Sequence, residues 1–361
     1  MAILLVILYH YISMTPPAAR GIVSYMQATF GMGWSGVNLF FVLSGFLIGG
    51  ILLDARNSTH YFKTFYLRRV HRIMPIYYLW IGIYFLVAFT PLVRWVGSTG
   101  IVPARPSIIP IYGFFLQNTV WSRQDAFRTV WLSALWSLAV EEQFYLVVPS
   151  VVRLFSKRGL VMLLGLTVLA GPLVRILVFR YIVPTHPAAP YMLTPCCADA
   201  LAMGVLLAVG WREESLKQWL QRNLRFVYAA VGLLSLGFAY LAITGKSQYS
   251  YAMSVWGFSC VDAFFAGLLV VALMAPRGIW AGICRWPFLT DVGGVSYCMY
   301  IIHASVNRVC HAFLSSSPDG ISTLSSSLAT LLAAIATWGL AKLSWRLLES
   351  PMIRRGHRYR Y

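Results

Sequence analysis

The stretch GWSGVNLFFVLSGFLIGGILL, residues 33–53, decides the fold class. It holds no Asp, Glu, Lys or Arg over 21 residues, and about 20 apolar residues are enough to cross a bilayer as an α-helix. Runs of similar length recur along the chain. Their continuity argues against the shorter, alternating strands of a membrane β-barrel. The sequence therefore predicts membrane-spanning helices.

The composition supports the same conclusion. Of the 361 residues, 59% are hydrophobic and 11% are charged, whereas a soluble domain carries about 25% charged residues. So little charge cannot cover a water-facing surface, and so much apolar surface excludes a disordered chain. We expect an all-α, polytopic integral membrane helix bundle that forms one membrane-embedded domain over residues 1–361, without a soluble second domain.

About ten spans are predicted, of which the first is unusually short. Fourteen residues rise only about 21 Å, against a hydrocarbon core of about 30 Å, so we expect a truncated first helix with residues missing before Met1. The spans cover residues 1–14, 33–53, 75–93, 131–152, 159–179, 191–211, 225–243, 251–275, 291–313 and 323–345.

The net charge of +18 is explained by topology. With both termini in the cytoplasm, the outside loops hold seven basic residues and the spans hold three, which leaves 19 of the 29 Lys and Arg inside. That asymmetry follows the positive-inside rule and leaves little support for a nucleic-acid partner. We expect a multi-pass protein of the inner (plasma) membrane. The outside residues are Arg20, Arg94, Arg105, Arg123, Arg128, Arg180 and Lys246, and those within spans are Arg175, Arg308 and Lys342.

Ionisable residues inside a membrane are costly, so each is a candidate functional residue. Glu141 and Glu142 are adjacent in the fourth span, and neighbouring helix positions point about 100° apart, so at most one should face a given site. Glu141 shares a face with Tyr145, four residues on. A structural hydrogen bond to a neighbouring helix is the alternative role, and it is stronger for Glu142.

His10 and an arginine pair are the other candidates. His10 lies in an apolar stretch, where an imidazole can act as a general base or can simply be a hydrogen-bonded core residue. Arg69 and Arg72 are three residues apart on a helix face, which suits a phosphate-bearing ligand. Attraction to anionic lipid headgroups is the alternative for this pair. The six cysteines have no spacing that indicates a disulfide framework or a metal site.

Six segments together resemble the membrane acyltransferase type 3 family, which includes O-acetyltransferases of bacterial surface polysaccharides. Each segment alone is weak, but they follow the family order and span nearly the whole chain. They are LVILYH (residues 5–10), NLFFVLSGFLI (38–48), RVHRIMP (69–75), WSLAVEEQFY (136–145), GVSYCMYIIH (294–303) and LESP (348–351).

The resemblance implies O-acyl transfer from a cytoplasmic acyl-CoA, usually acetyl-CoA, to a hydroxyl of a cell-envelope carbohydrate, a lipid-linked glycan or a glycosylated metabolite, with membrane lipid as the surroundings and no bound cofactor. It implies His10 and Glu141 as catalytic residues, and Arg69 and Arg72 as the acyl-CoA-binding pair. Ser44, Tyr145 and His303 also stand in family motifs, where they are expected to shape the cavity.

The sequence departs from the family pattern in two places. An Asp/Arg-bearing stretch usually precedes the first histidine, and here the chain begins at Met1. In PCCADALAMG (residues 195–204), Cys197 holds a position where the family usually has Arg, so Asp199 is expected to lack its charge partner. These departures keep a degenerate, non-catalytic relative as one alternative. A transporter is another, because buried carboxylates also mark ion pathways.

Overall fold

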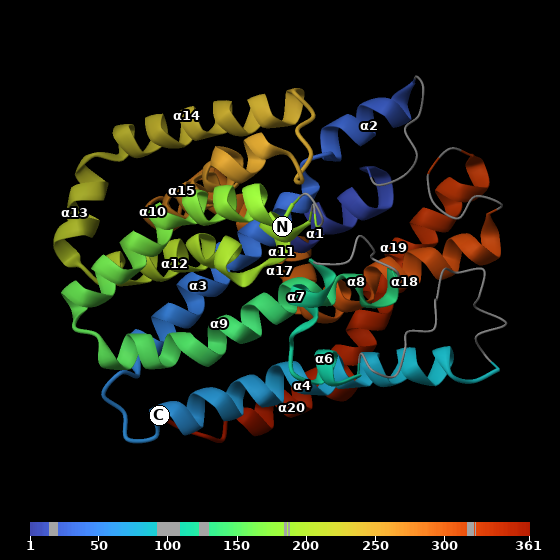
Figure 1. Cartoon of the computed structure of the whole chain (residues 1–361), viewed down its shortest axis with the longest axis horizontal. Coiled ribbons are helices and arrows are strands. Elements are labelled where there is room, and N and C mark those ends of the chain that lie inside the picture. Colours follow the sequence, from blue (N-terminus) through green and yellow to red (C-terminus); the bar gives the residue numbers. More distant parts are fainter. Residues whose placement is uncertain are drawn as a thin grey trace.

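A computed structural model describes residues 1–13, 21–91, 109–122, 130–183, 186, 188–315, 321 and 323–361. All regular structure in these ranges is helical (Figure 1). The long helices are α3 (Gly36–Asp54), α4 (Tyr61–Ala88), α9 (Leu135–Leu154), α10 (Lys157–Tyr181), α12 (Thr194–Gly210), α14 (Leu224–Ile243), α15 (Phe258–Met274), α18 (Ser296–Leu314) and α19 (Leu324–Ser344).

Shorter elements extend or connect these helices. The α-helical ones are α1 (Ala2–Leu8), α2 (Ile22–Phe30), α6 (Ile109–Gly113), α7 (Gln117–Trp121), α8 (Val130–Ser133), α11 (Ala189–Met192), α13 (Glu214–Arg222), α16 (Ile279–Cys284), α17 (Pro287–Gly294) and α20 (Ser350–Gly356). Three are π-helical, namely η1 (Tyr9–Ser13), η5 (Met253–Gly257) and η6 (Trp345–Glu349), and η2 (Gly33–Ser35) is a 3₁₀ turn.

Each predicted span corresponds to a helix, and seven helices in the described ranges are long and apolar enough to cross a membrane. The three predicted spans that fall short are the 12-residue helix Ala2–Ser13, together with α9 and α18. The last two carry polar groups such as Glu141 and Asn307. All three contribute to the candidate site below.

The loops after α3, α9 and α12, which carry basic residues expected on the inside, lie at one end of the bundle, toward the left of Figure 1. Arg212, after α12, forms two hydrogen bonds to the Asp54 carboxylate at the end of α3, of 2.8 and 2.7 Å. Arg56 donates to the Phe155 carbonyl beyond α9, and Arg68 of α4 donates to the Tyr359 carbonyl near the C-terminus. Of the seven outside residues, Arg20, Arg94, Arg105, Arg123 and Arg128 lie outside the described ranges.

Helices α3 and α12 pack closely through glycine. A Cβ atom on Gly45 would overlap the Leu201 carbonyl, and one on Gly204 would overlap the Val42 carbonyl. Small residues allow this backbone approach, which is a common basis for helix association in membranes. The small-residue spacing of residues 40–49 predicts such packing, and the structure confirms it. The contact fixes α3, which supplies residues to both cavities described next.

Candidate active site

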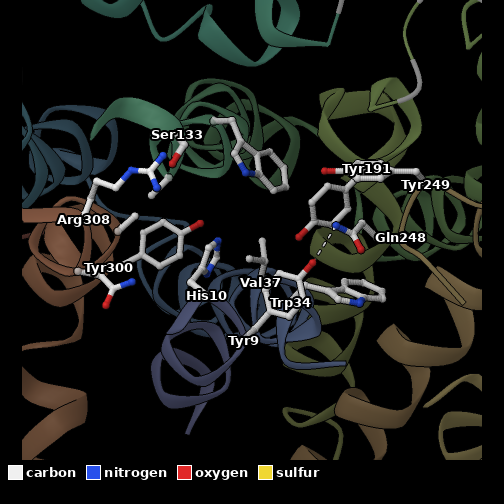
Figure 2. A pocket seen from close by; sticks show the side chains of 14 residues that line it. Tyr9, His10, Trp34, Val37, Ser133, Tyr191, Gln248, Tyr249, Tyr300 and Arg308 are labelled. Atoms are coloured by element: carbon white, nitrogen blue, oxygen red, sulfur yellow. Dashed lines mark hydrogen bonds between the residues drawn. The ribbon is translucent and has the colours of Figure 1, made fainter. Parts of the chain in front are cut away.

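Two cavities in the described part of the bundle are lined by the candidate residues. The larger, which we call the arginine cavity, has a volume of about 560 Å³ and is lined by Arg69 and Arg72 of α4 and Glu141 of α9, among others. The smaller, which we call the histidine cavity, has a volume of about 190 Å³ and is lined by His10 of η1 and Trp34 of η2, among others (Figure 2). The catalytic candidates His10 and Glu141 therefore lie in different cavities.

The two cavities follow one another along the helices. The chain from Ala2 to Ile3 lines the arginine cavity, and Tyr9 and His10 line the histidine cavity. Six residues of α-helix separate Ile3 from Tyr9 by about 9 Å. Helix α18 shows the same order, with Ser296 at the arginine cavity and Asn307 at the histidine cavity.

The two cavities adjoin at two lining residues that they share. Val37 of α3 and Tyr300 of α18 line both. The Tyr300 hydroxyl forms a 2.5 Å hydrogen bond with the Ser137 hydroxyl of α9, which lines the arginine cavity. We call Val37, Ser137 and Tyr300 the partition.

A chain of hydrogen bonds places the carboxylate of the arginine cavity. Tyr145 donates to Glu141 Oε2 at 3.0 Å, and the Ser44 hydroxyl lies 2.6 Å from the Tyr145 oxygen. The spacing of Glu141 and Tyr145 predicts a shared helix face, and the structure confirms it. Glu142 lines neither described cavity, and its Oε1 is buried without a hydrogen-bond partner among the described residues. Of the two adjacent glutamates, Glu141 lines a described cavity and Glu142 lines none of the described ones.

The two arginines give the cavity its positive charge. Arg69 lies with its guanidinium carbon 5.9 Å from the centre of the Tyr145 ring, and its Nε is buried without a hydrogen-bond partner in the described part of the chain. Arg72 is more exposed and lines the same cavity. Planar guanidinium groups with available donors suit bidentate contacts with phosphate. The cavity can therefore accept an anionic, phosphate-bearing ligand.

His10 is held in a defined tautomer. Its Nδ1 lies 2.8 Å from the Val6 carbonyl, which can only accept, so Nδ1 carries the proton of the neutral ring and Nε2 keeps its lone pair. His10 belongs to a π-helical turn, a local widening that is frequent at functional sites.

His303 is the neighbour of His10, at 4.8 Å between ring centres. His303 Nδ1 is bound in the same way to the Tyr300 carbonyl at 2.7 Å, and its side chain is fully buried and lines neither cavity. The structure thus pairs His10 with His303, whereas Glu141 is paired with Tyr145. Ser44 and Tyr145 line the arginine cavity.

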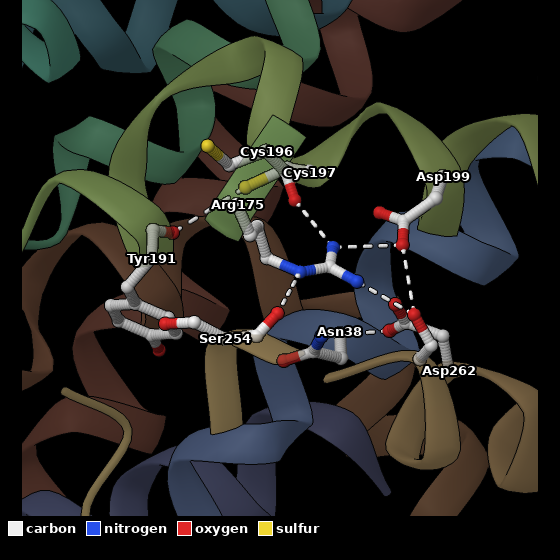
Figure 3. Close-up of polar contacts among 9 residues, drawn as sticks. Asn38, Arg175, Tyr191, Cys196, Cys197, Asp199, Ser254 and Asp262 are labelled. Atoms are coloured by element: carbon white, nitrogen blue, oxygen red, sulfur yellow. Dashed lines mark hydrogen bonds and ion pairs between the residues drawn. The ribbon is translucent and has the colours of Figure 1, made fainter. Parts of the chain in front are cut away.

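A buried ion pair lies beside the histidine cavity, and it corrects the expectation that Asp199 lacks a charge partner. Arg175 of α10 approaches Asp199 Oδ2 at 2.8 Å, and both side chains are 1% exposed (Figure 3). Arg175 also donates to the Ser254 and Cys196 carbonyls, at 3.1 and 2.8 Å, and to the Ser259 hydroxyl at 2.6 Å. Position 197 holds Cys where the family usually has Arg, and the positive charge beside Asp199 comes instead from Arg175 on the neighbouring helix α10.

Several lining residues of the histidine cavity were not predicted. They are aromatic or polar side chains from segments far apart in the sequence. The main ones are Trp34, Tyr191, Gln248, Asn307 and Arg308. Aromatic residues in apolar spans cannot be told from ordinary core residues by sequence. Asn307 and Arg308 are adjacent polar residues within a span, and such residues indicate a functional site.

An integral-membrane helix bundle with internal cavities is the class of protein that the fold defines. The family model described as an acyltransferase domain matches residues 1–342, and the chain belongs to this family. The resemblance to the membrane acyltransferase type 3 family is thereby confirmed.

Curated relatives have consistent names. The chain is 28% identical over 334 residues to a peptidoglycan O-acetyltransferase, OatA, of Listeria monocytogenes, covering 90% of this chain and 52% of the relative. It is 25% identical over 343 residues to an O-acetyltransferase, OatA, of Staphylococcus aureus strain NCTC 8325, covering 90% and 53%. The chain spans about half the length of the curated relatives it matches. No solved structure matches it.

Proposed function

We propose that this chain is an integral-membrane O-acetyltransferase that moves an acetyl group from acetyl-CoA to a hydroxyl of a cell-envelope carbohydrate. The observation that carries the proposal is the pair of cavities, one with two arginines and one with a histidine base, that meet at a partition. Such an arrangement suits two substrates that approach from opposite sides. Cell-wall glycan is the leading acceptor class, because the Listeria relative is named for peptidoglycan.

The arginine cavity is the proposed acyl-CoA site. Arg69 and Arg72 hold the CoA phosphates, and the thioester reaches along the cavity toward the partition. A cytoplasmic donor fits the end of the bundle where Arg56, Arg68 and Arg212 gather. With that end in the cytoplasm, the protein is a multi-pass inner-membrane protein with both termini on the cytoplasmic side.

His10 is the proposed general base. Its Nε2 takes the proton from the acceptor hydroxyl while that oxygen bonds to the thioester carbonyl carbon. The carbon–sulfur bond then breaks, and the proton held by His10 neutralises the departing CoA thiolate. Glu141, held by its hydrogen bond from Tyr145, stabilises from the arginine cavity the positive charge that His10 acquires.

The test is transfer of labelled acetyl from acetyl-CoA by purified protein in nanodiscs. His10→Ala should lower turnover about 10²- to 10⁴-fold, the usual contribution of a general base. His357→Ala, at an exposed histidine near the C-terminus, is the matched control and should leave turnover unchanged. Wild-type turnover by folded His10→Ala protein would refute the assignment of the base.

A further inference from the structure

The histidine cavity has the features of a binding site for a ring. Trp34, Trp136 and Tyr191 are 2%, 5% and 8% exposed and contribute to its lining. Tyr191 is fixed by contacts on several sides, since its ring centre lies 5.8 Å from that of Trp34 and 4.7 Å from that of Trp136. These aromatic faces form a rigid wall at little cost in side-chain entropy.

Polar groups are placed around the aromatic wall. Gln248 Nε2 donates to the Tyr9 hydroxyl oxygen at 3.1 Å, so the Tyr9 hydrogen is available to another acceptor. Asn307 is 6% exposed and lines the cavity, and its Oδ1 is buried with no hydrogen-bond partner among the described residues. A buried amide oxygen normally has a partner, so its lack of one here points to a ligand that donates a hydrogen bond.

Size and charge limit the ligand. The volume of about 190 Å³ lies below the about 300–1,000 Å³ of pockets for drug-sized ligands. The described lining holds Arg308 and no Asp or Glu, so nothing there selects a cationic ligand. A purely apolar ligand would leave Asn307 Oδ1 unpaired. A small ring that bears hydroxyl groups can pack against the aromatic side chains and can also form hydrogen bonds with the amide groups.

We propose that the histidine cavity binds a single pyranose ring of the acceptor and presents one of its hydroxyls to His10. The carbon-bound hydrogens of the ring pack against Trp34 and Trp136, and Asn307 Oδ1 accepts a hydrogen bond from a second hydroxyl. Gln248 and Tyr9 bind the opposite edge. This assignment rests on the proposed function, because the acceptor hydroxyl must lie beside the base.

Ligand-observed NMR without acetyl-CoA tests the site separately from the chemistry. N-acetylglucosamine is the probe, and sorbitol, an open-chain polyol, is the comparison ligand. The protein in nanodiscs should give a saturation-transfer signal for the ring sugar and little for sorbitol. Asn307→Leu breaks no hydrogen bond of Oδ1 and should fold, yet should weaken sugar binding about two- to twelvefold, the usual net effect of one hydrogen bond. Trp34→Leu should weaken it as well.

Asn57→Leu is the matched control, because Asn57 is exposed and lines neither cavity, and it should bind the sugar like the wild type. Equal signals for both ligands, or sugar binding unchanged in Asn307→Leu and Trp34→Leu, would overturn the site. Sugar binding without acetyl transfer would overturn the proposed function and leave the site in place. Acetyl transfer without ring-selective binding would overturn the sugar site and leave the proposed function in place.

Discussion

Replacing Arg175 by Met removes the cation of the buried network in Figure 3 and keeps an unbranched side chain of similar length. Arg175 donates four hydrogen bonds, to Asp199, the Ser254 and Cys196 carbonyls and the Ser259 hydroxyl. The removal of one partner of a buried ion pair costs about 3–5 kcal/mol. We therefore predict a loss of about 4 kcal/mol in the free energy of unfolding.

The measurement is SDS-driven unfolding in mixed micelles, followed with a thiol-reactive dye. Cys196, Cys197 and Cys298 are free and at most 8% exposed, so they react when the bundle opens. Arg180→Met, at an exposed position on the same helix, is the matched control and should change stability by less than about 0.5 kcal/mol.

A double variant isolates the charge pair. Arg175→Met combined with Asp199→Leu removes both ions and should recover part of the loss, because Asp199 no longer remains as an uncompensated carboxylate. The buried Asp262 beside it keeps its hydrogen bond from Asn38 in both variants. An Arg175→Met protein as stable as the wild type would refute the argument that Arg175 replaces the missing cation. A double variant less stable than Arg175→Met would show that Asp199 is stabilising without its partner, which contradicts the same reasoning.

Three further predictions concern the arginine cavity and the helix packing. Arg69→Gln should raise the KM for acetyl-CoA about tenfold or more, because a charged hydrogen bond contributes about 1.5–3 kcal/mol. Arg68→Gln is the control, since Arg68 lies outside the cavity and its loss should leave this KM unchanged. Equal KM values for the two variants in steady-state kinetics would contradict the phosphate-binding role of Arg69. Tyr145→Phe removes the hydroxyl that donates to Glu141, and it should lower kcat by about tenfold with an unchanged KM for acetyl-CoA. A kcat like that of the wild type would exclude a role for this hydrogen bond in the reaction. Gly204→Ala should destabilise the bundle by about 1–3 kcal/mol or more in SDS unfolding, because its Cβ would overlap the backbone of α3. Gly82→Ala is the control and should not destabilise the bundle, because a Cβ there meets nothing within 4 Å. Equal losses of stability in the two variants would argue against the close packing of α3 and α12.

The spans were predictable because the cost of exposing peptide groups to lipid imposes long apolar helices. The ends of the helices could not be predicted from hydropathy. α4 begins at Tyr61, well before the predicted span start at residue 75, because the basic segment that precedes the apolar run is helical as well. The short helix α2 lies in a stretch that was not assigned to any span. Hydropathy detects the part of a helix that lies in lipid and does not detect its extension beyond the membrane.

The candidate site shows a similar division. Local spacing was enough to place Arg69 with Arg72 on one helix face and Glu141 with Tyr145 on another, but it did not predict that the two pairs line the same cavity. The partner of Asp199 lies on another helix, and no local pattern predicts which helix faces it. A lone arginine in the middle of an apolar helix was nonetheless a signal that a counter-ion must lie nearby.

The partition also has an electrical consequence. A bacterial plasma membrane maintains a voltage, and one elementary charge that crosses 100 mV changes its energy by about 2.3 kcal/mol. In the proposed function the two substrates approach the cavities from opposite sides, so a water-filled passage between the cavities would let ions dissipate that voltage. Val37 and Tyr300 line both cavities, and the Tyr300 hydroxyl is bound to Ser137, so the packing of these side chains decides how easily ions could move from one cavity to the other. The acetyl group that leaves CoA for the acceptor is uncharged, so its transfer moves no net charge.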